Sequence, residues 1–393
     1  MSPRLVRPRF RALAVLPPLL LAAATARAGL DPPQSGDLFS FPGAFANPAT
    51  PVAAGRALAD RWLGEAPWDN PAIGGDRWSV SGALLYLRED RQDLHAANRQ
   101  FDGGQGTFDL GSGSLLAPLP LHLSLSLYSY PTEARSEDVA FYAGLGTDPS
   151  QPSALVTAKT DTREIRSGAG LSREIFGGLR LGAAVEVTNR SDEWTRTLES
   201  GAPESGTYHT NWNGDAVGGQ AGFRWAHGDT AGRPLVVGGA LRYLPELKVT
   251  GENTTDLLVG STDSSVTTRR ASGWEGGVSA AWRFVPAARV VAGLGARSAM
   301  VWSDLDATTG RWWNGALAFD YHDPEAPWTL RAGYALDQQS DVVEDRAGTL
   351  GLSLGWDFTG VRVELGGIHR SIHRTGHPNS YEDRALLGFT ADF

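Results

Sequence analysis

Large apolar residues alternate with small or polar ones along most of this chain. The segment 349–358 reads TLGLSLGWDF, in which every second residue is leucine, tryptophan or phenylalanine. A β-strand points successive side chains to opposite faces, so such a segment has one apolar and one polar face. Similar stretches recur along the chain, for example at 179–188, 235–249 and 361–366. We count about fourteen such strands between residues 77 and 393, which predicts an all-β fold.

Two all-β architectures use this alternation. A soluble β-sandwich buries its apolar faces, whereas a membrane barrel turns them to lipid and keeps the polar faces inside. Here the polar faces are rich in glycine, serine and paired charges, and aromatic residues gather near the strand ends, as in interfacial girdles. The last strand ends in Phe393, and this ending resembles the C-terminal signal strand of bacterial outer-membrane barrels. We therefore predict a closed transmembrane antiparallel β-barrel over residues 77–393, which the barrel-assembly machinery recognises through Phe393.

The first 28 residues have the parts of a secretory signal peptide. Four arginines precede an apolar run at 12–24, which is too short to cross a membrane as a helix. The sequence ARA at 26–28 then fits the small-residue cleavage pattern. We predict a signal peptide over residues 1–28, and an outer-membrane location in a Gram-negative-type, diderm bacterium.

Charge and cysteine content exclude several classes of function. The net charge is −9, and it becomes −14 without residues 1–28, which hold five arginines and no acid. A nucleic-acid-binding protein needs a basic face, so we expect no nucleic-acid partner. The chain has no cysteine, which excludes disulfides and thiolate metal sites. The GLSLG match at 351–355 lies inside an alternating strand, not at the strand-to-helix turn of a serine nucleophile. We expect no enzyme activity, no catalytic residue, no metal and no cofactor.

Residues 29–76 form a separate segment that does not alternate. It contains several prolines, together with phenylalanines and tryptophans such as Phe45, Trp62 and Trp68. This content is too apolar for a flexible tail in water. We therefore predict that residues 29–76 form a hatch or plug inside the barrel.

The connections between the predicted strands are of two lengths. Short ones include 176–178 and 359–360, whereas long polar ones cover roughly 131–161, 192–212, 251–264 and 373–380. In outer-membrane barrels the short turns face the periplasm and the long loops face outward. We expect the same arrangement here.

Charged residues on the polar faces are expected to line the lumen. The set is Arg180, Glu186, Arg242, Glu246, Arg331, Arg362 and Glu364. Two hypotheses account for them: a network of ion pairs that fills the barrel, and a charged path for an acidic or polar ligand. Mixed signs suit a filled interior better than a selectivity ring of one sign, in which like charges repel.

Three motifs, in this order, resemble the FadL-type family of outer-membrane transporters for long-chain fatty acids and aromatic hydrocarbons. They are GRA at 55–57 followed by Asn70, Pro71 and Ala72, LRYLPELKVTG at 241–251, and WTLRAGYALD at 328–337. The resemblance implies a barrel with an N-terminal hatch that carries the Asn-Pro-Ala motif. It also implies a monomer in outer-membrane lipid, and passive uptake of a hydrophobic small-molecule ligand from the outer side.

Two other functions remain open. The barrel could scaffold a secretion or surface-attachment system without transport, as some relatives in this family do. It could also be a diffusion porin for polar solutes, which requires an open lumen without a bound hatch.

Overall fold

The computed structural model describes most of the predicted barrel and the end of the segment before it. The described residues are 67–75, 77–91, 100–101, 107–143, 154–199, 206–227, 235–257, 260–303, 307–309, 311–322, 326–340, 345–374 and 380–393. The predicted signal peptide and residues 29–66 of the predicted hatch segment lie outside this set. Within it, no helix is long and apolar enough to cross a membrane.

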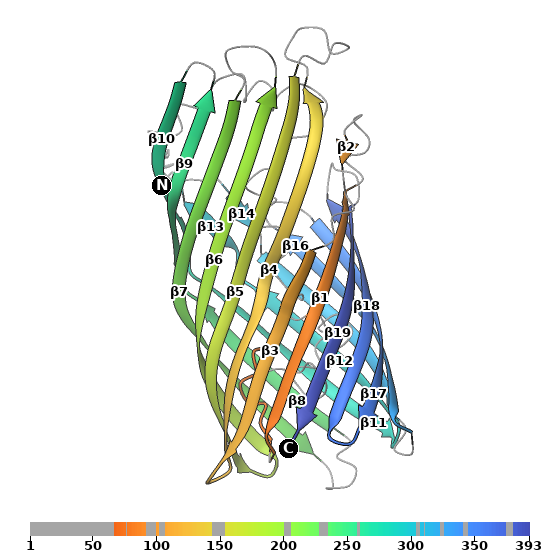
Figure 1. The fold of residues 1–393 in the computed structure, drawn as a ribbon. Coiled ribbons are helices and arrows are strands. Elements are labelled where there is room, and N and C mark those ends of the chain that lie inside the picture. Colours follow the sequence, from red (N-terminus) through yellow and green to blue (C-terminus); the bar gives the residue numbers. More distant parts are fainter. Residues whose placement is uncertain are drawn as a thin grey trace, which may run out of the picture.

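All described strands belong to one antiparallel sheet, which closes on itself (Figure 1). The first half of the sheet contains β1 Ser79–Arg91, β2 Gln100–Phe101, β3 Thr107–Leu119, β4 Leu123–Ala143, β5 Ala154–Phe176, β6 Leu179–Glu199, β7 Gly206–His227, β8 Leu235–Leu244, β9 Leu247–Leu257 and β10 Gly260–Arg270. The second half contains β11 Gly273–Val285, β12 Ala288–Arg297, β13 Met300–Ser303, β14 Ala307–Thr309, β15 Arg311–His322, β16 Trp328–Ser340, β17 Asp345–Phe358, β18 Val361–Arg374 and β19 Ser380–Asp392.

The sheet closes where β1 meets the last strand. β1 pairs with β19 along its whole length, from Ser79 opposite Asp392 to Arg91 opposite Ser380. Closure pairs backbone groups that would otherwise be left unsatisfied in lipid. When the interrupted pairs of segments β2/β3, β8/β9, β10/β11, β12/β13 and β14/β15 are each taken as one strand, the barrel has fourteen. The predicted fold class and strand number are confirmed.

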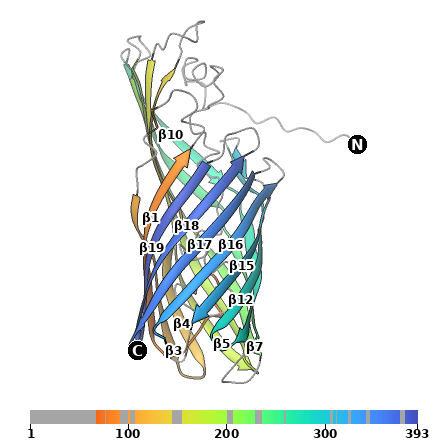
Figure 2. The same ribbon diagram turned by 90° about the vertical axis from the view of Figure 1, so that its right-hand side faces the viewer.

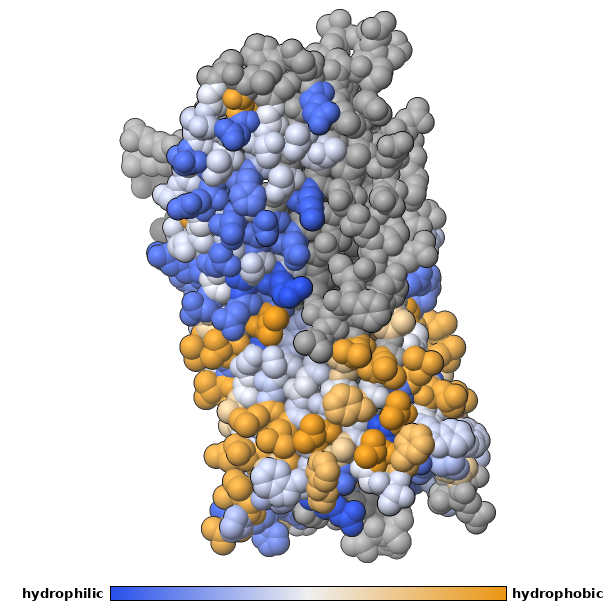
Figure 3. Space-filling view, viewed as in Figure 1, coloured by the Kyte–Doolittle hydropathy of each residue, from blue (hydrophilic) through white to orange (hydrophobic). Residues whose placement is uncertain are grey.

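The outer face of the barrel carries an apolar band (Figure 3). On β17 the alternation places Leu350, Leu352 and Leu354 outward, each about half exposed, while Gly351 and Ser353 are buried. Trp225, Trp282 and Trp356 lie toward the short-turn end of this band, and Trp274 lies toward the other end. An exposed apolar belt of this extent indicates a lipid-facing surface.

A charge in the middle of this band is expected to destabilise the barrel. Leu354 is 53% exposed near the centre of the outward apolar run of β17, so Leu354→Arg should lower the free energy of unfolding in lipid vesicles by about 2–4 kcal/mol. Asn213→Arg is the matched control, because Asn213 is exposed on the outer face of β7 beyond the band. We expect its effect to stay within about 0.5 kcal/mol. Equal losses in the two variants would contradict the assignment of the band to lipid.

Three of the four predicted long loops are largely strands in their described parts, so this part of the prediction is wrong; residues 375–379 of the fourth lie outside the described residues. β4 and β5 pair continuously from Leu123 opposite Arg173 to Ala143 opposite Ala154, which covers most of 131–161. Likewise, β6 and β7 pair up to Leu198 and Gly206, and β9 and β10 pair up to Leu257 and Gly260. Strands β4–β7, β9 and β10 therefore rise beyond β15–β19 (Figures 1 and 2).

The physical reason lies in the outward side chains of these strands. On β7 the apolar outward residue Val217 is followed, toward the tall end, by outward Asp215, Asn213 and Asn211. Beyond the band both faces of the sheet are polar, so the hydropathy alternation disappears although the hydrogen-bonded ladder continues. The hydropathy alternation therefore indicates which part of a strand contacts lipid, and it does not indicate where the strand ends.

Several predicted single strands are also interrupted. Pro245 and Glu246 separate β8 from β9, and residues 271–272 separate β10 from β11. The first short turn is made by residues 120–122, with positive φ at Leu121 and His122, and Pro118 lies within β3. Proline has no amide hydrogen, so it is tolerated in a strand at a position that makes no ladder hydrogen bond.

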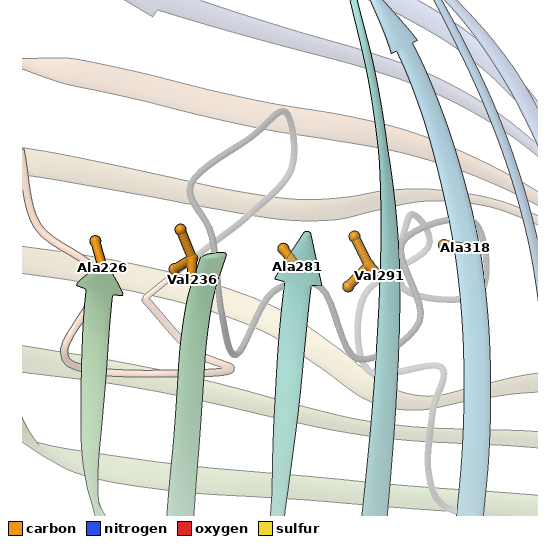
Figure 4. Packing of buried hydrophobic residues seen from close by; sticks show 5 residues of the cluster. All are labelled: Ala226, Val236, Ala281, Val291 and Ala318. Carbon is orange, nitrogen blue, oxygen red and sulfur yellow. The ribbon is translucent and has the colours of Figure 1, made fainter. Parts of the chain in front are cut away.

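Small apolar side chains form one row on the inner face of five neighbouring strands. Ala226 of β7, Val236 of β8, Ala281 of β11, Val291 of β12 and Ala318 of β15 lie side by side in register and are buried (Figure 4). Such small residues add little bulk inside the barrel.

Candidate functional site

Residues 67–75, called the inner segment below, pack against the inner face of the wall. Trp68, Asn70, Ala72 and Ile73 are all at most 1% exposed. Their partners come from β4 to β8, whose inward side chains surround the segment. Of the predicted hatch, this is the part that the structure describes.

Asn70 fastens the inner segment to β7. Its Nδ2 donates to the backbone oxygen of Phe223 at 2.9 Å, and its Oδ1 accepts from the Ala72 amide at 2.9 Å. Its own carbonyl accepts from the Ile73 amide at 3.0 Å. Asparagine commonly stabilises a turn in this way, and Pro71 at the next position fixes φ. The Asn-Pro-Ala motif thus forms a tight turn that bonds to the barrel wall.

Glycines in the wall make room for this turn. A Cβ added to Gly182 of β6 would lie 2.1 Å from the Pro71 carbonyl oxygen, and one added to Gly222 of β7 would lie 2.2 Å from Asn70 Oδ1. These distances are far below van der Waals contact, so only glycine permits the approach. The wall is therefore shaped to the Asn-Pro-Ala turn at two positions on adjacent strands.

Trp68 anchors the other end of the inner segment in an aromatic cluster. Its ring stacks on Tyr130 at 5.5 Å between centroids and meets Tyr128 edge-on at 6.4 Å. The backbone is held as well, because Gln220 Nε2 donates to the Pro67 carbonyl at 3.1 Å and Arg242 donates to the Trp68 carbonyl. Aromatic pairs of this kind contribute about 0.5–1.5 kcal/mol beyond the area that they bury.

Arg242 is the centre of a buried network around the inner segment. Its Nε donates to Glu186 Oε2 at 2.8 Å, and its other nitrogens donate to Glu275 and to Gln220 Oε1, the latter at 3.1 Å. Glu186 also accepts from the Tyr128 hydroxyl at 2.9 Å. One arginine therefore links the inner segment to side chains of β6, β7 and β11.

A second cluster surrounds Glu164 of β5. Its carboxylate accepts from Arg270 at 2.6 Å, from Arg190 at 3.2 Å and from Arg166 at 3.4 Å. Arg190 also forms a two-point pair with Asp192, at 2.7 and 2.9 Å. All these side chains are buried.

A third group of charges lies nearer the short-turn end. Arg331 donates to Glu364 Oε2 at 2.6 Å, and Arg289 donates to Asp320 at 2.8 Å. Carboxylates and guanidinium groups thus alternate through the barrel. This is the arrangement expected when ion pairs fill an interior, because each buried charge needs a partner of opposite sign.

The predicted lumen residues lie in different places. Buried positions are held by Arg180, Glu186, Arg242, Arg331 and Glu364. Arg362 is half-buried and pairs with Asp357. The expectation for Glu246 is wrong: its side chain is 56% exposed and pairs at 3.5 Å with Arg269, which is equally exposed.

The reason for the error at Glu246 is the interruption of the strand at Pro245. Past it, Leu247 and Val249 are buried and Lys248 is exposed, opposite Arg269 of β10. A two-residue interruption shifts the alternation, so a pattern extrapolated through a proline assigns the wrong face.

Sequence reasoning missed several charged residues of the interior. The group is Glu164, Arg166, Arg190, Asp192, Arg270, Glu275, Arg289 and Asp320. These residues follow the same inward–outward alternation along their strands as the predicted lumen residues do. Arg190 and Asp192 alternate with exposed Asn189, Ser191 and Glu193, but all five are polar, so hydropathy does not separate the two faces.

Among the described residues, no group of three or more histidine, aspartate or glutamate side chains is arranged to hold a metal ion. Each charged cluster contains both carboxylates and arginines, and the arginines donate hydrogen bonds to the carboxylates of the same cluster. These clusters can hold a chain segment in place or interact with a polar group.

Comparison with known proteins gives a clear structural result. No family model matches the sequence and no curated protein is similar to it. Among solved structures, the CymD monoaromatic hydrocarbon channel aligns over 87% of this chain and 97% of its own, with a TM-score of 0.60 and 12% identity.

Two further structures give similar values. The Pseudomonas putida toluene transporter TodX aligns over 88% of this chain and 98% of its own, with a TM-score of 0.60 and 14% identity. A Pseudomonas aeruginosa FadL homologue aligns over 87% and 98%, with a TM-score of 0.58 and 16% identity. The chain therefore has the fold of the FadL-type outer-membrane transporters.

Proposed function

We propose that this protein is an outer-membrane channel for passive uptake of hydrophobic small molecules, and that the inner segment closes it at rest. The observation that carries the proposal is the fit of residues 67–75 against the barrel wall, within a fold shared with hydrocarbon channels. A ligand would enter from the tall, outer end. It would be released after the segment rearranges.

The interior supports this function over that of a diffusion porin. A porin needs a continuous water-filled lumen. In this barrel the inner segment and the ion-pair clusters around Arg242 and Glu164 lie on the inner side of the wall, where they would narrow such a lumen.

Release of the inner segment requires polar and aromatic contacts to break. Side chains of Ser124, Gln220 and Arg242 donate to its backbone, Asn70 donates to the Phe223 carbonyl, and Trp68 packs on Tyr128 and Tyr130. The hydrogen bonds are between partners that can exchange with water, at a net cost of about 1 kcal/mol each. The proposed hatch residues Asn70, Pro71 and Ala72 would move together, because they form one turn.

The same proposal implies a membrane, an oligomeric state and an assembly signal for this protein. The outer apolar band would contact outer-membrane lipid in a diderm bacterium, and the barrel would act as a monomer. Phe393, exposed at the end of the chain, would serve as the assembly signal during insertion.

Uptake by proteoliposomes tests the proposed function. We expect the full chain to speed entry of a hydrophobic probe such as toluene into vesicles, while vesicle swelling in arabinose matches that of protein-free vesicles. Rapid swelling in arabinose would identify an open porin instead. Absence of accelerated entry for both solutes would contradict transport.

The tall strands favour one second candidate, a scaffold for a surface-exposed protein. They present a polar outer face beyond the apolar band, with exposed Asn211, Asn213 and Asp215 on β7. A defined protein that co-purifies in fixed ratio, together with no toluene entry, would support this candidate over uptake.

A further inference from the structure

The upper part of β10 is a free edge of the sheet in the part of the chain that the structure describes. On one side β10 pairs with β9 from Gly260 to Arg270. On the other side its described partner is β13, and this pairing covers only Arg269 and Arg270. In Figure 1, β10 is the outermost strand at the left of the tall end. One row of its backbone N–H and C=O groups therefore has no neighbouring strand among those described.

Both faces of the sheet are open at this edge. Residues 260–265 are all exposed, although successive side chains of a strand point to opposite faces. At about 3.4 Å per residue, these residues give an edge about 20 Å long. This is the length of a typical strand, so the edge can receive one strand of another chain.

The sequence of β10 lacks the features that commonly block such an edge. Natural proteins protect exposed edges with lysine, proline or a β-bulge. β10 reads GSTDSSVTTRR, which contains neither lysine nor proline, and its register with β9 runs without a shift. Its threonines and valine favour the extended conformation. The edge is therefore able to pair with a further strand.

Acidic side chains lie on the outer face beside the free edge. In the register of the two strands, Asp263 of β10 lies diagonally across from Asp256 and Glu252 of β9. All three carboxylates are exposed. On the far side of β9, the two acids are opposite Thr207 and Asn211 of β7, which carry no charge. This corner of the tall wall is therefore negatively charged on its outer face.

The cationic side chains of the same face lie farther from the free edge. Lys248 and Arg269 are opposite each other, and Lys248 is four positions from Glu252 along β9, which corresponds to about 13 Å. His209 lies on β7, behind β9 as seen from the edge, and hydrogen-bonds Thr195 of β6 at 3.0 Å. A strand added to β10 at 260–265 would therefore meet the carboxylates first.

We propose that the free edge of β10 at 260–265 binds an extended, basic segment of another protein as an added strand. Backbone hydrogen bonds along the edge would supply affinity, and lysine or arginine on the outer face of the added strand would complement Asp263 and its two acidic neighbours. A second copy of this chain fits less well, because two upright barrels would bring their acidic corners together. The site goes beyond the proposed uptake, which needs no protein partner, and it gives the scaffold candidate a defined contact.

Peptide binding to the purified full chain in non-ionic detergent tests the site. The probe is a fluorescent peptide of about nine residues in which lysine and threonine alternate. Fluorescence anisotropy gives its dissociation constant. We expect saturable binding, and binding at least about tenfold weaker when glutamate replaces lysine, because like charges then face one another. Equal affinity for the two peptides, or no binding of the lysine peptide, would overturn the inference.

N-methylation of the peptide separates strand addition from simple attraction between charges. In a strand the amides of alternate residues point to the same edge. One peptide methylated at its lysine amides and another methylated at its threonine amides are therefore blocked on opposite edges. Only one of the two should bind more weakly, by at least about tenfold, because it loses several hydrogen bonds to β10. Equal affinities of the two methylated peptides would contradict strand addition.

Asp263→Asn tests whether the peptide binds at this edge. We expect the variant to bind the lysine peptide about threefold more weakly. Asp215→Asn is the matched control, because Asp215 is also an exposed acid but lies on β7 opposite Lys248. Its affinity should equal that of the parent, and equal losses in both variants would contradict the location. A dimer of the full chain that the peptide dissociates would assign the edge to a second copy and overturn the proposal. None of these results depends on toluene entry, so the site and the uptake function can fail separately.

Discussion

Gly182→Ala is expected to open the barrel. The added Cβ would lie 2.1 Å from the Pro71 carbonyl oxygen and 2.5 Å from the Ala72 amide nitrogen. Both are backbone atoms of a turn that Asn70 holds rigidly, so they cannot yield by a rotamer change. The wall strand β6 is bonded to β5 and β7 along its length, whereas the inner segment is one short turn held by side-chain hydrogen bonds and by packing of Trp68. The inner segment is therefore the part that moves.

Single-channel recording in a planar bilayer measures the effect. The parent protein should show no steady conductance, and Gly182→Ala should show long-lived open events. Gly113→Ala is the matched control, because a Cβ there has its nearest neighbour, the Ser81 carbonyl oxygen, at 3.8 Å. We expect the control to remain closed. A folded Gly182→Ala protein that is as closed as the parent would show that the inner segment does not block the lumen.

Arg242→Met is expected to cause the largest loss of stability. Methionine keeps most of the volume but removes the partner of Glu186 and of Glu275, and the donor to the Trp68 carbonyl. Breaking a buried ion pair from one side costs about 3–5 kcal/mol, because a buried charge is left uncompensated. The variant should also release the inner segment, since Arg242 is one of its anchors.

Urea unfolding in lipid vesicles measures this loss. Arg269→Met is the control, because the same substitution breaks an ion pair, with Glu246, that is more than half exposed. Exposed pairs contribute about 0–1 kcal/mol, so the control should unfold near the parent. Losses of similar size in both variants would mean that the Arg242 network is hydrated and that the interior is not filled.

The alternation of residues predicted the barrel well because it reports a direct physical requirement. An outward residue within the band must be apolar to face lipid, and Leu350, Leu352 and Leu354 all do so. The same requirement separated the inward charges Arg180, Glu186 and Glu364 from their neighbours. The Asn-Pro-Ala turn at 70–72 was also predicted before the first strand, in the segment that packs inside the wall.

The pattern failed wherever lipid no longer constrains the outer face. Strands β5–β7 continue beyond the band with polar residues on both sides, so 192–212 looked like a loop although most of it is paired. Glu246 was assigned inward because the alternation was carried through Pro245. Arg190 and Asp192 were missed for the same reason as the long strands: their exposed neighbours are also polar.

The sequence by itself determined that this chain forms a closed barrel of about fourteen strands with its apolar face outward, because hydropathy acts residue by residue and needs no knowledge of neighbours. Only the tertiary structure decided which charges meet, since Glu164 and Arg270 are 106 positions apart and are joined by sheet register. It also decided that Gly182 and Gly222 receive the Asn-Pro-Ala turn. Those properties depend on distances across the barrel, which no local pattern encodes.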